Sequence, residues 1–518
     1  MFKSLRHMAH LCRIGFVLSR HDALMDLMSL FGDEPRAMTR LRKIRNFKNK
    51  SSDQPAPSHL VEAFHSLGPS FIKIGQAMAT RPDIIGQDVA RDLMRLQDKV
   101  PPFSSAQAIA IIEQELGASL DDLFRDFNPD PVAAASIAQV HFATTKEGRR
   151  VAVKVLRPDI EKAFARDLES FLWLARLMER FSTKARRLKP TSVVEAISET
   201  IALEMDLRFE AAAASELKEN SAGNTDYAVP DVDWDLTSRR ILCTSLVEGI
   251  PFSQKDKIIA AQHDMQKLAE GLVHSFLTQA LNYGFFHADL HQGNLFACKD
   301  DKGQGNKITA IDFGIMGRID KKTRRTLAQI LYGFITQDYD LIAKAHFDSG
   351  YVPENQSFEK FKQAIRAIGA PIAGKPVSEI SVGKLLAQLF ETTETFNMQT
   401  QPQLILLQKT MVTVEGVALN LYPDINMWDA SRPIIEKWMR DNLGPQAKIQ
   451  DIAETALDSV KRLPKILDDI EALASAARKL QETQGRHGGR SALRLCLYGM
   501  IGGLMGSLAL YFLYKIFN

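Results

Sequence analysis

Residues 287–294 read His-Ala-Asp-Leu-His-Gln-Gly-Asn, and Asp312-Phe313-Gly314 begins eighteen residues after Asn294. Phosphoryl transfer depends on holding Mg²⁺ against the phosphates and on orienting the acceptor in line. A loop with an Asp and, five positions later, an Asn supplies an acceptor-side carboxylate and a metal ligand, and the Asp of D-F-G supplies another ligand. The pattern therefore predicts Asp289 as a catalytic residue, and Asn294 and Asp312 as ligands of Mg²⁺.

The segment between the two motifs has the pattern of a β-hairpin. Leu295–Cys298 and Ile308–Ile311 are short apolar runs on either side of a polar, glycine-bearing turn. Such runs predict two antiparallel strands. We expect this hairpin to join the two motifs in the C-lobe of a kinase-like fold.

A second hairpin is predicted upstream, from Ile137–Phe142 and Arg150–Leu156 around a turn at 146–148. It places Lys154 on a strand among apolar neighbours, where a lysine can contact the α- and β-phosphates of a nucleotide. We therefore expect Lys154 to bind ATP (or ADP). Val247, at the end of a strand predicted over 239–247, is also expected to contact the nucleotide.

A single helix is predicted over Thr191–Asn220, and it carries the acids that could pair with Lys154. A kinase-type lysine needs a carboxylate from a facing helix. Glu204, Asp206 and Glu210 are all candidates, and on a continuous helix Asp206 and Glu210, four apart, share a face. The residues alone leave the choice among the three open.

The loop before the first hairpin departs from that of an ordinary kinase. Glycines there allow the backbone to approach phosphates closely. This chain has Ala133, Ala134, Ala135 and Ser136 instead. We expect these residues to line the nucleotide site with reduced backbone freedom, and to alter nucleotide preference or slow transfer to an external acceptor.

The composition is that of a globular protein with more than one core: 518 residues, 45% hydrophobic and 25% charged. The net charge of +3 is uneven, because residues 1–50 carry +7 and the remainder −4. The four scattered cysteines fit a reducing compartment. No zinc spacing and no basic-aromatic platform is present, so nucleic acid is not an expected partner.

Both ends of the chain have features of membrane association. Residues 1–20 lack acids, and their apolar residues recur at helical spacing, which fits either a transit peptide or an interfacial amphipathic helix. Leu495–Tyr514 is an uncharged run of the length that spans a bilayer. Its paired G-x-x-x-G spacings allow a homodimer contact or lipid-facing glycines. Arginines before the span place the large domain on the cytoplasmic side.

Together these residues resemble the UbiB-type atypical kinase family. Lys73-Ile74-Gly75-Gln76 resembles its K-x-G-Q signature, Ala133–Ser136 its alanine-rich loop and Glu204-Met205-Asp206 its E-x-D motif. Gln403–Ala418 resembles a segment of its bacterial members. The resemblance implies that Glu210 is the partner of Lys154, and that Lys73, Glu204 and Asp206 act at the catalytic side.

The predicted fold class is therefore α+β: a bilobal atypical protein-kinase-like fold with a helical N-terminal extension and a C-terminal transmembrane helix. The expected domains are a basic amphipathic segment (1–50), a helical extension with K-x-G-Q (51–128), an N-lobe (129–250), a C-lobe (251–430), a helical tail and tether (431–490) and the transmembrane helix (491–518).

The resemblance implies a membrane-bound Mg²⁺-ATPase for ubiquinone biosynthesis, with polyprenylphenol precursors, anionic membrane lipids and ubiquinone-biosynthesis enzymes as partners. It also implies a segment with Lys73 folded over the protein-substrate site. The expected location is the bacterial inner (cytoplasmic) membrane, rather than the mitochondrial inner membrane. A protein kinase, a small-molecule phosphotransferase and a catalytically inactive nucleotide-binding scaffold are the alternatives. A hydroxylase is set aside, because no flavin fingerprint or di-iron pair is present.

Overall fold

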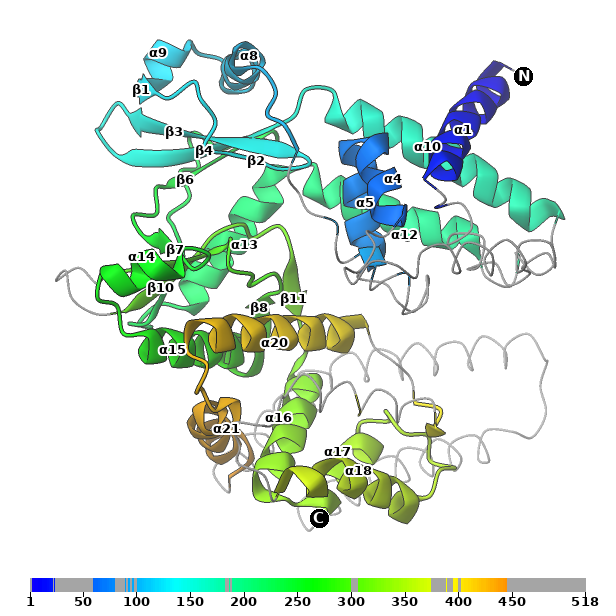
Figure 1. Ribbon diagram of the computed structural model, residues 1–518, viewed down its shortest axis with the longest axis vertical. Helices are drawn as coiled ribbons and strands as arrows, with labels where there is room; N and C mark the ends of the chain where they lie inside the picture. Colours follow the sequence, from blue (N-terminus) through cyan, green and yellow to red (C-terminus); the bar gives the residue numbers. More distant parts are fainter. Residues whose placement is uncertain are drawn as a thin grey trace, which may run out of the picture. The chain divides into compact units, whose positions relative to one another are not determined.

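The computed structural model describes residues 2–21, 23, 59–79, 89, 92–93, 96, 100–181, 186, 189–299, 306–373, 388, 395–398 and 402–444. The chain divides into two units, Met1–Ile434 and Ile435–Asn518. Helix α21 (Met427–Leu443) begins in the first unit and ends in the second. Every other element below belongs to the first unit (Figure 1).

The N-terminal lobe is built on a five-stranded antiparallel sheet in the order β1-β3-β4-β6, with β2 paired to β3. Its strands are β1 (Phe124–Phe127), β2 (Ala133–Ala134), β3 (Ala138–Thr145), β4 (Arg150–Leu156) and β6 (Ile241–Ser245). Val151, Val153 and Val155 of β4 are buried in one core cluster. Because side chains alternate along a strand, Lys154 lies on the other face. The predicted hairpin is confirmed; β1 is a strand where the sequence predicted helix.

The helices of this lobe correct one prediction. They are α10 (Ile160–Phe181), α12 (Pro190–Glu204) and α13 (Leu207–Asn220). The predicted single helix over 191–220 is wrong, since the chain breaks at Met205. Asp206 has extended backbone angles and accepts a hydrogen bond from the backbone N–H of Arg208, as an N-cap residue does. Asp206 is therefore outside α13 and does not share a helix face with Glu210.

A group of helices precedes the sheet: α1 (Phe2–Arg20), α4 (His59–Leu67), α5 (Pro69–Ala79), α8 (Ser105–Leu116) and α9 (Leu120–Leu123). Gly68-Pro69 separates α4 from α5, as a glycine followed by a proline favours. Ile14 and Leu18 of α1 are buried in one cluster with Leu60 and Phe71. One face of α1 is thus part of a protein core.

The C-terminal lobe combines small sheets with helices. Its strands are β5 (Tyr227–Ala228), β7 (Ile250–Pro251), β8 (Phe285–His287), β9 (Leu295–Cys298), β10 (Lys307–Ala310) and β11 (Met316–Arg318). Its helical elements are α14 (Lys255–Ala260), α15 (Met265–Thr278), the π-helical turn η2 (Gln279–Tyr283), α16 (Lys321–Thr336), α17 (Tyr339–Asp348), α18 (Phe358–Ala373) and α20 (Pro402–Leu421). Strands β9 and β10 pair antiparallel, which confirms the predicted hairpin between the two motifs.

Within the described residues, one helix is long and apolar enough to cross a membrane: Gln403–Leu421, which lies in α20. Several of its residues are packed inside the lobe. The buried hydroxyl of Thr410 donates a hydrogen bond to the carbonyl of Ala288, in the catalytic loop, and α20 packs against α15. This packing favours a core helix of the lobe. The predicted span at Leu495–Tyr514 and the tether before it lie outside the described residues.

The observed architecture is the predicted α+β, kinase-like fold of two lobes. Strand β6 belongs to the sheet of the first lobe, and β7, five residues further on, belongs to a sheet of the second. The link between them contains Val247. Segment 287–294 begins at the end of β8 and the D-F-G turn follows β10, so both motifs lie on the second lobe, whereas Lys154 lies on β4 of the first.

Candidate active site

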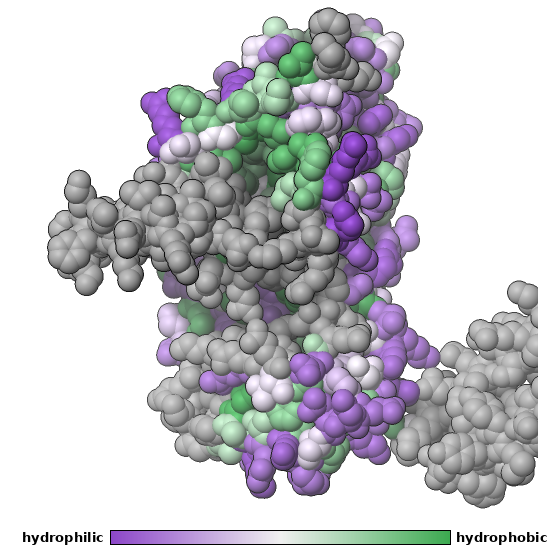
Figure 2. Space-filling model, turned by 90° about the vertical axis from the view of Figure 1, so that its right-hand side faces the viewer, coloured by the Kyte–Doolittle hydropathy of each residue, from purple (hydrophilic) through white to green (hydrophobic). Residues whose placement is uncertain are grey.

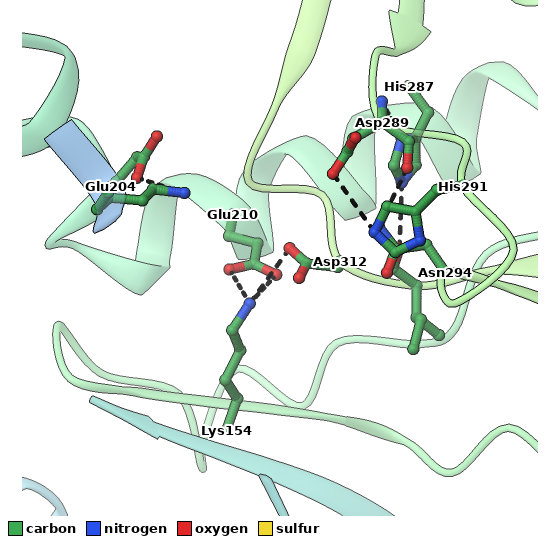
Figure 3. Close-up of polar contacts among 10 residues, drawn as sticks. Lys154, Glu204, Glu210, His287, Asp289, His291, Asn294 and Asp312 are labelled. Atoms are coloured by element: carbon green, nitrogen blue, oxygen red, sulfur yellow. Dashed lines mark hydrogen bonds and ion pairs between the residues drawn. The ribbon is translucent and has the colours of Figure 1, made fainter. Parts of the chain in front are cut away.

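Lys154 is the centre of the site. Its ammonium lies 2.9 Å from both carboxylate oxygens of Glu210, in the first turn of α13, and 3.3 Å from Oδ1 of Asp312. Figure 3 shows the lysine between these two acids. The fold thus selects Glu210 among the three acids that the residues alone left open, and it is the partner that the family resemblance implies. It brings together the lysine of one lobe and the D-F-G aspartate of the other.

The charges in this cluster hold one another in their ionised forms. Burial lowers the pKa of Lys154, but the carboxylates of Asp312 and Glu210 outweigh it and raise that pKa above its ordinary value. The Lys154 ammonium holds the pKa of Asp312 well below its usual range, and the ammonium of Lys73 acts in the same direction. Both lysines therefore contribute to the field at the predicted metal ligand.

His287 connects the two motifs. Its ring is fully buried; Nδ1 accepts a hydrogen bond from the backbone N–H of Asp289, and Nε2 lies 3.1 Å from the carbonyl of Ile311. Because Nδ1 accepts, the proton belongs on Nε2, which donates to Ile311. Burial lowers the pKa of His287, which favours this neutral ring. The histidine fixes the catalytic loop to the residue immediately before Asp312.

The catalytic loop is held by hydrogen bonds within itself. The side-chain amide of Asn294 donates to the carbonyl of Asp289 at 3.1 Å, and the backbone N–H of Ile311 donates to the carbonyl of Asn294 at 2.9 Å. The His291 ring lies 3.7 Å from the Asp289 carboxylate. Asn294 is buried, whereas the side chain of Asp289 is about one third exposed. The loop therefore presents Asp289 toward open space and Asn294 beside the D-F-G turn.

The D-F-G turn is shaped by Asp312 and Phe313. Asp312 has φ of 63°, a left-handed conformation that Asp tolerates better than most residues. Phe313 is buried, and its ring lies 5.3 Å from that of His287. The backbone turn directs Asp312 to Lys154 while the phenylalanine anchors it in the lobe.

The break between α12 and α13 separates the two acids of the E-x-D motif. Glu204, the last residue of α12, forms an ion pair of 2.8 Å with Lys73, and both side chains are 12% exposed. Asp206 instead takes two hydrogen bonds from the guanidinium of Arg208, at 2.9 and 2.7 Å, and these lower its pKa. Lys73 thus pairs with Glu204, and Asp206 serves as a helix cap.

The helix that carries Lys73 packs closely on its neighbours because of Gly75. A β-carbon at this position would lie 2.4 Å from Cδ1 of Leu96 and 2.6 Å from Cδ2 of Phe64. The side chain of Gln76 donates a hydrogen bond to the carbonyl of Leu96. The glycine and glutamine of the K-x-G-Q signature therefore fix the packing of α5 against its neighbours, and the lysine extends from α5 to Glu204.

Arg157 fixes the backbone of the alanine-rich segment, because its guanidinium donates two hydrogen bonds to the carbonyl of Ala135, at 2.8 and 3.0 Å. Ala133 and Ala134 are not loop residues, because they pair with β3 as strand β2. The hydroxyl of Ser136 is buried and has no hydrogen-bond partner among the described residues. Val247 lies in the link between β6 and β7. Contact of Val247 and of these residues with a nucleotide stays a prediction.

Helix α13 has a second contact with the C-terminal lobe, which the sequence did not predict. Arg318 of β11, just after D-F-G, donates to Glu216 of α13 at 2.7 Å and lies 4.4 Å above the ring of Phe285. No motif marks this pair. The one signal in the sequence is an acid six residues after Glu210, on the following turns of the same helix.

The fold and the site define a kinase-like protein. The ABC1 atypical kinase-like domain matches residues 95–346, and the UbiB helical domain matches residues 365–426. The "Probable protein kinase UbiB" of Pseudomonas entomophila (strain L48) is 40% identical over 447 residues, which are 85% of this chain and 82% of that protein.

Proteins with the same name from Marinobacter nauticus and Azotobacter vinelandii are 42% and 39% identical, over 79% and 90% of this chain and 75% and 88% of theirs. This chain belongs to the UbiB family. Among solved structures, the complex of Rv3197 with erythromycin from Mycobacterium tuberculosis is similar with a TM-score of 0.48 and 20% identity, over 77% of this chain and 98% of that one.

Proposed function

We propose that this protein is a membrane-associated, Mg²⁺-ATP-dependent ATPase or phosphotransferase of ubiquinone biosynthesis, acting on polyprenylated phenol intermediates. The observation that carries the proposal is the convergence of Lys154, Glu210 and Asp312 from three separate elements. This arrangement is what phosphoryl transfer requires of a kinase-like fold.

The residues present fit Mg²⁺ and a nucleotide. The described residues contain no group of three or more His, Cys, Asp or Glu side chains that could hold a metal. Mg²⁺ does not need such a group, because it is commonly bound by one or two protein oxygens together with phosphates and waters. Asn294 and Asp312 would hold it. Lys154 would face the phosphates, and so would the hydroxyl of Ser136, which has no hydrogen-bond partner within the part of the chain that the structure describes.

Lys73 supports hydrolysis, or transfer to a small acceptor, over phosphorylation of another protein. Its ion pair with Glu204 is largely buried, and α5 packs tightly through Gly75. A peptide acceptor would have to displace this helix and break the pair. Water or a phenol is small enough to reach Asp289 without that cost. Bound Mg²⁺-ATP would supply the phosphoryl group, while Asp289 would orient the acceptor oxygen.

The ubiquinone assignment rests on family membership and on the K-x-G-Q and E-M-D segments, which are here joined by an ion pair. The membrane assignment rests on the predicted span at 495–514 and the basic N-terminus. The bacterial relatives favour the inner membrane with the catalytic unit on the cytoplasmic side.

The test is phosphate release from Mg²⁺-ATP by the full chain in lipid nanodiscs, with and without a prenylated phenol. Release that the phenol stimulates and that Asp312→Asn abolishes supports the proposal. Release that is absent although nucleotide binds would favour the inactive scaffold. Transfer of labelled phosphate to the phenol would separate a phosphotransferase from an ATPase.

A further inference from the structure

Helix α1 has an apolar stripe on its exposed side. Leu5, Met8 and Phe16 are 51%, 50% and 70% exposed, which is unusual for side chains of this size. Their spacing of three and eight residues places them on one face of the helix, together with the exposed Cys12. The stripe is distinct from the face that packs into the protein core.

The opposite face of α1 is fixed to the protein. Ile14 and Leu18 are buried with Leu60 and Phe71, and two histidines form hydrogen bonds with α10. His7 lies 3.1 Å from the hydroxyl of Ser170 and His10 lies 2.8 Å from the carboxylate of Asp167. The exposed stripe can therefore be covered by a partner while the inner face stays packed.

A row of arginines runs along one edge of the stripe. Arg6, Arg13 and Arg20 recur every seven residues and so share a side of the helix, and residues 2–20 contain no acid. Figure 2 views the side of the molecule that is on the right in Figure 1, where α1 lies. Its upper part shows hydrophobic side chains beside strongly hydrophilic ones. An apolar stripe with a basic edge is the chemistry of a helix that lies on an anionic lipid surface.

Asp167 connects this helix to the site. It is fully buried in α10 and accepts hydrogen bonds from two other helices: from His10 of α1, and from Ser70 of α5 at 2.5 Å. Ser70 lies in the first turn of α5, and Lys73 follows one turn later. A single carboxylate thus ties α1 to the helix whose lysine pairs with Glu204.

We propose that the exposed stripe of α1 docks on an anionic lipid bilayer, and that Asp167 transmits this docking to α5 and so holds Lys73 on Glu204. The inference deepens the proposed function, on which it rests, by naming the surface that contacts lipid and its route to the site. Docking immobilises α1, and the shared carboxylate then restricts α5. The occupant is lipid because three apolar side chains and an arginine row complement a negatively charged bilayer.

Docking of α1 can be measured by fluorescence, without any catalytic turnover. In the full chain with Cys496→Ser, an environment-sensitive fluorophore on Cys12 reports the polarity around the stripe, since Cys243 and Cys298 are buried. The protein is placed in nanodiscs of phosphatidylcholine alone or with phosphatidylglycerol. We expect the emission to move to an apolar value only in the anionic discs, and to return to the polar value at high salt.

Charge removal tests the arginine row. Arg13→Gln and Arg20→Gln should each lower the equilibrium constant for docking about fivefold, because each basic residue near an anionic surface contributes a factor of about that size to membrane binding. The matched control, Lys344→Gln with Lys360→Gln, removes two exposed charges from the C-terminal lobe and should leave emission unchanged. Identical emission in both kinds of disc would overturn the docking surface. So would a shift that depends on protein concentration instead of lipid, which would indicate a second copy of the chain.

The route to the site is tested by the rate at which an amine reagent labels Lys73, measured by mass spectrometry. Docking should slow this labelling in anionic discs relative to neutral ones. Ser70→Ala and Asp167→Asn should each abolish the difference while Cys12 still reports docking. If both variants keep the lipid-dependent protection, Asp167 is not the route. Ser70→Ala removes one hydroxyl and guards against a folding defect in Asp167→Asn. Neither readout needs ATP turnover, so loss of the proposed activity would leave both interpretable.

Discussion

Two lysines pair with two glutamates that lie on opposite sides of the break between α12 and α13, and the surroundings of the two pairs differ. Lys154 comes from the sheet and meets Glu210 at the start of α13, whereas Lys73 comes from α5 and meets Glu204 at the end of α12. Lys154 also meets Asp312 of the second lobe. In a continuous helix, acids six residues apart would not be arranged for two such partners. The break at Met205 turns one acidic segment into two separate ion pairs.

The difference indicates two roles. The Lys154 pair belongs to the machinery that a kinase-like fold uses to hold phosphate and metal. The Lys73 pair joins the helical extension to α12, and in the proposed function it closes the side of the site where an acceptor would bind. The variants below test whether the two pairs are separable, in order of decreasing expected effect.

The largest effect is expected for Asp312→Asn, which removes the carboxylate that Lys154 and the predicted metal share. Phosphate release should fall about 10³-fold, since metal-assisted charge stabilisation contributes several kcal/mol. Exposed Asp348→Asn on α17 is the matched control and should retain the full rate. Retention of more than a tenth of the rate by Asp312→Asn would remove Asp312 from the metal site.

Lys154→Met should lower kcat/KM by about 10²-fold, as the loss of a preorganised cation does. It also leaves Glu210 buried without its partner, which should cost about 3 kcal/mol of folding free energy. Adding Glu210→Gln should recover much of the stability but none of the turnover. Denaturant titration and phosphate release on the same samples measure both. Unchanged stability in Lys154→Met would contradict the buried pair.

Gly75→Ala tests the close packing of α5, the helix that carries Lys73. The added methyl would meet Leu96 and Phe64 at distances below 3 Å, so α5 must shift, at a cost of about 2 kcal/mol. Gly416 of α20 has nothing within 4 Å of its would-be β-carbon. Gly416→Ala should therefore be neutral or stabilising by about 0.5 kcal/mol. Equal effects of the two changes on the unfolding midpoint would argue against a special fit at Gly75.

Lys73→Met should reduce turnover about tenfold, because it removes a cation that acts on Asp312 and an anchor of α5. Glu204→Gln should give the same reduction, since the two side chains form one pair. The comparison is made by steady-state phosphate release. Independent, additive losses in the double variant would show that the pair is not a unit.

The smallest effect concerns Arg318 and Glu216, the second contact between α13 and the strand after D-F-G. The pair is largely exposed, so a double-mutant cycle with Arg318→Gln and Glu216→Gln should give a coupling of about 0.5 kcal/mol. Turnover should change little. A coupling well above this value would mean that α13 is held mainly from this end.

Much of the fold follows from local patterns. The alternation around Lys154, the hairpin between Asn294 and Asp312 and the break at Gly68-Pro69 are all short-range signals, and the structure agrees with them. The bilobal fold class followed from two motifs in their order. The prediction of one helix over 191–220 failed because two local preferences compete there. The mixture of apolar and acidic residues favours a continuous helix, but Asp206 caps the start of a new one.

The residues alone predicted the site as a set of side chains, and only the family resemblance implied the pair of Lys154 with Glu210. Spacing could not choose among Glu204, Asp206 and Glu210, because the choice depends on which face each half-helix presents. The buried polar link through Asp167, and the pair of Arg318 with Glu216, connect residues about 100 to 160 positions apart in the chain. No periodicity or motif encodes such contacts.

The separation of the two lysines is best tested by the dissociation constant of a non-hydrolysable ATP analogue with Mg²⁺, determined by calorimetry for Lys154→Met and Lys73→Met side by side. We expect binding to weaken at least about tenfold for Lys154→Met, since a phosphate contact is lost. For Lys73→Met we expect a change within about twofold. Equal weakening in both variants would contradict separate roles for the two lysines, and would make the two ion pairs parts of one nucleotide site.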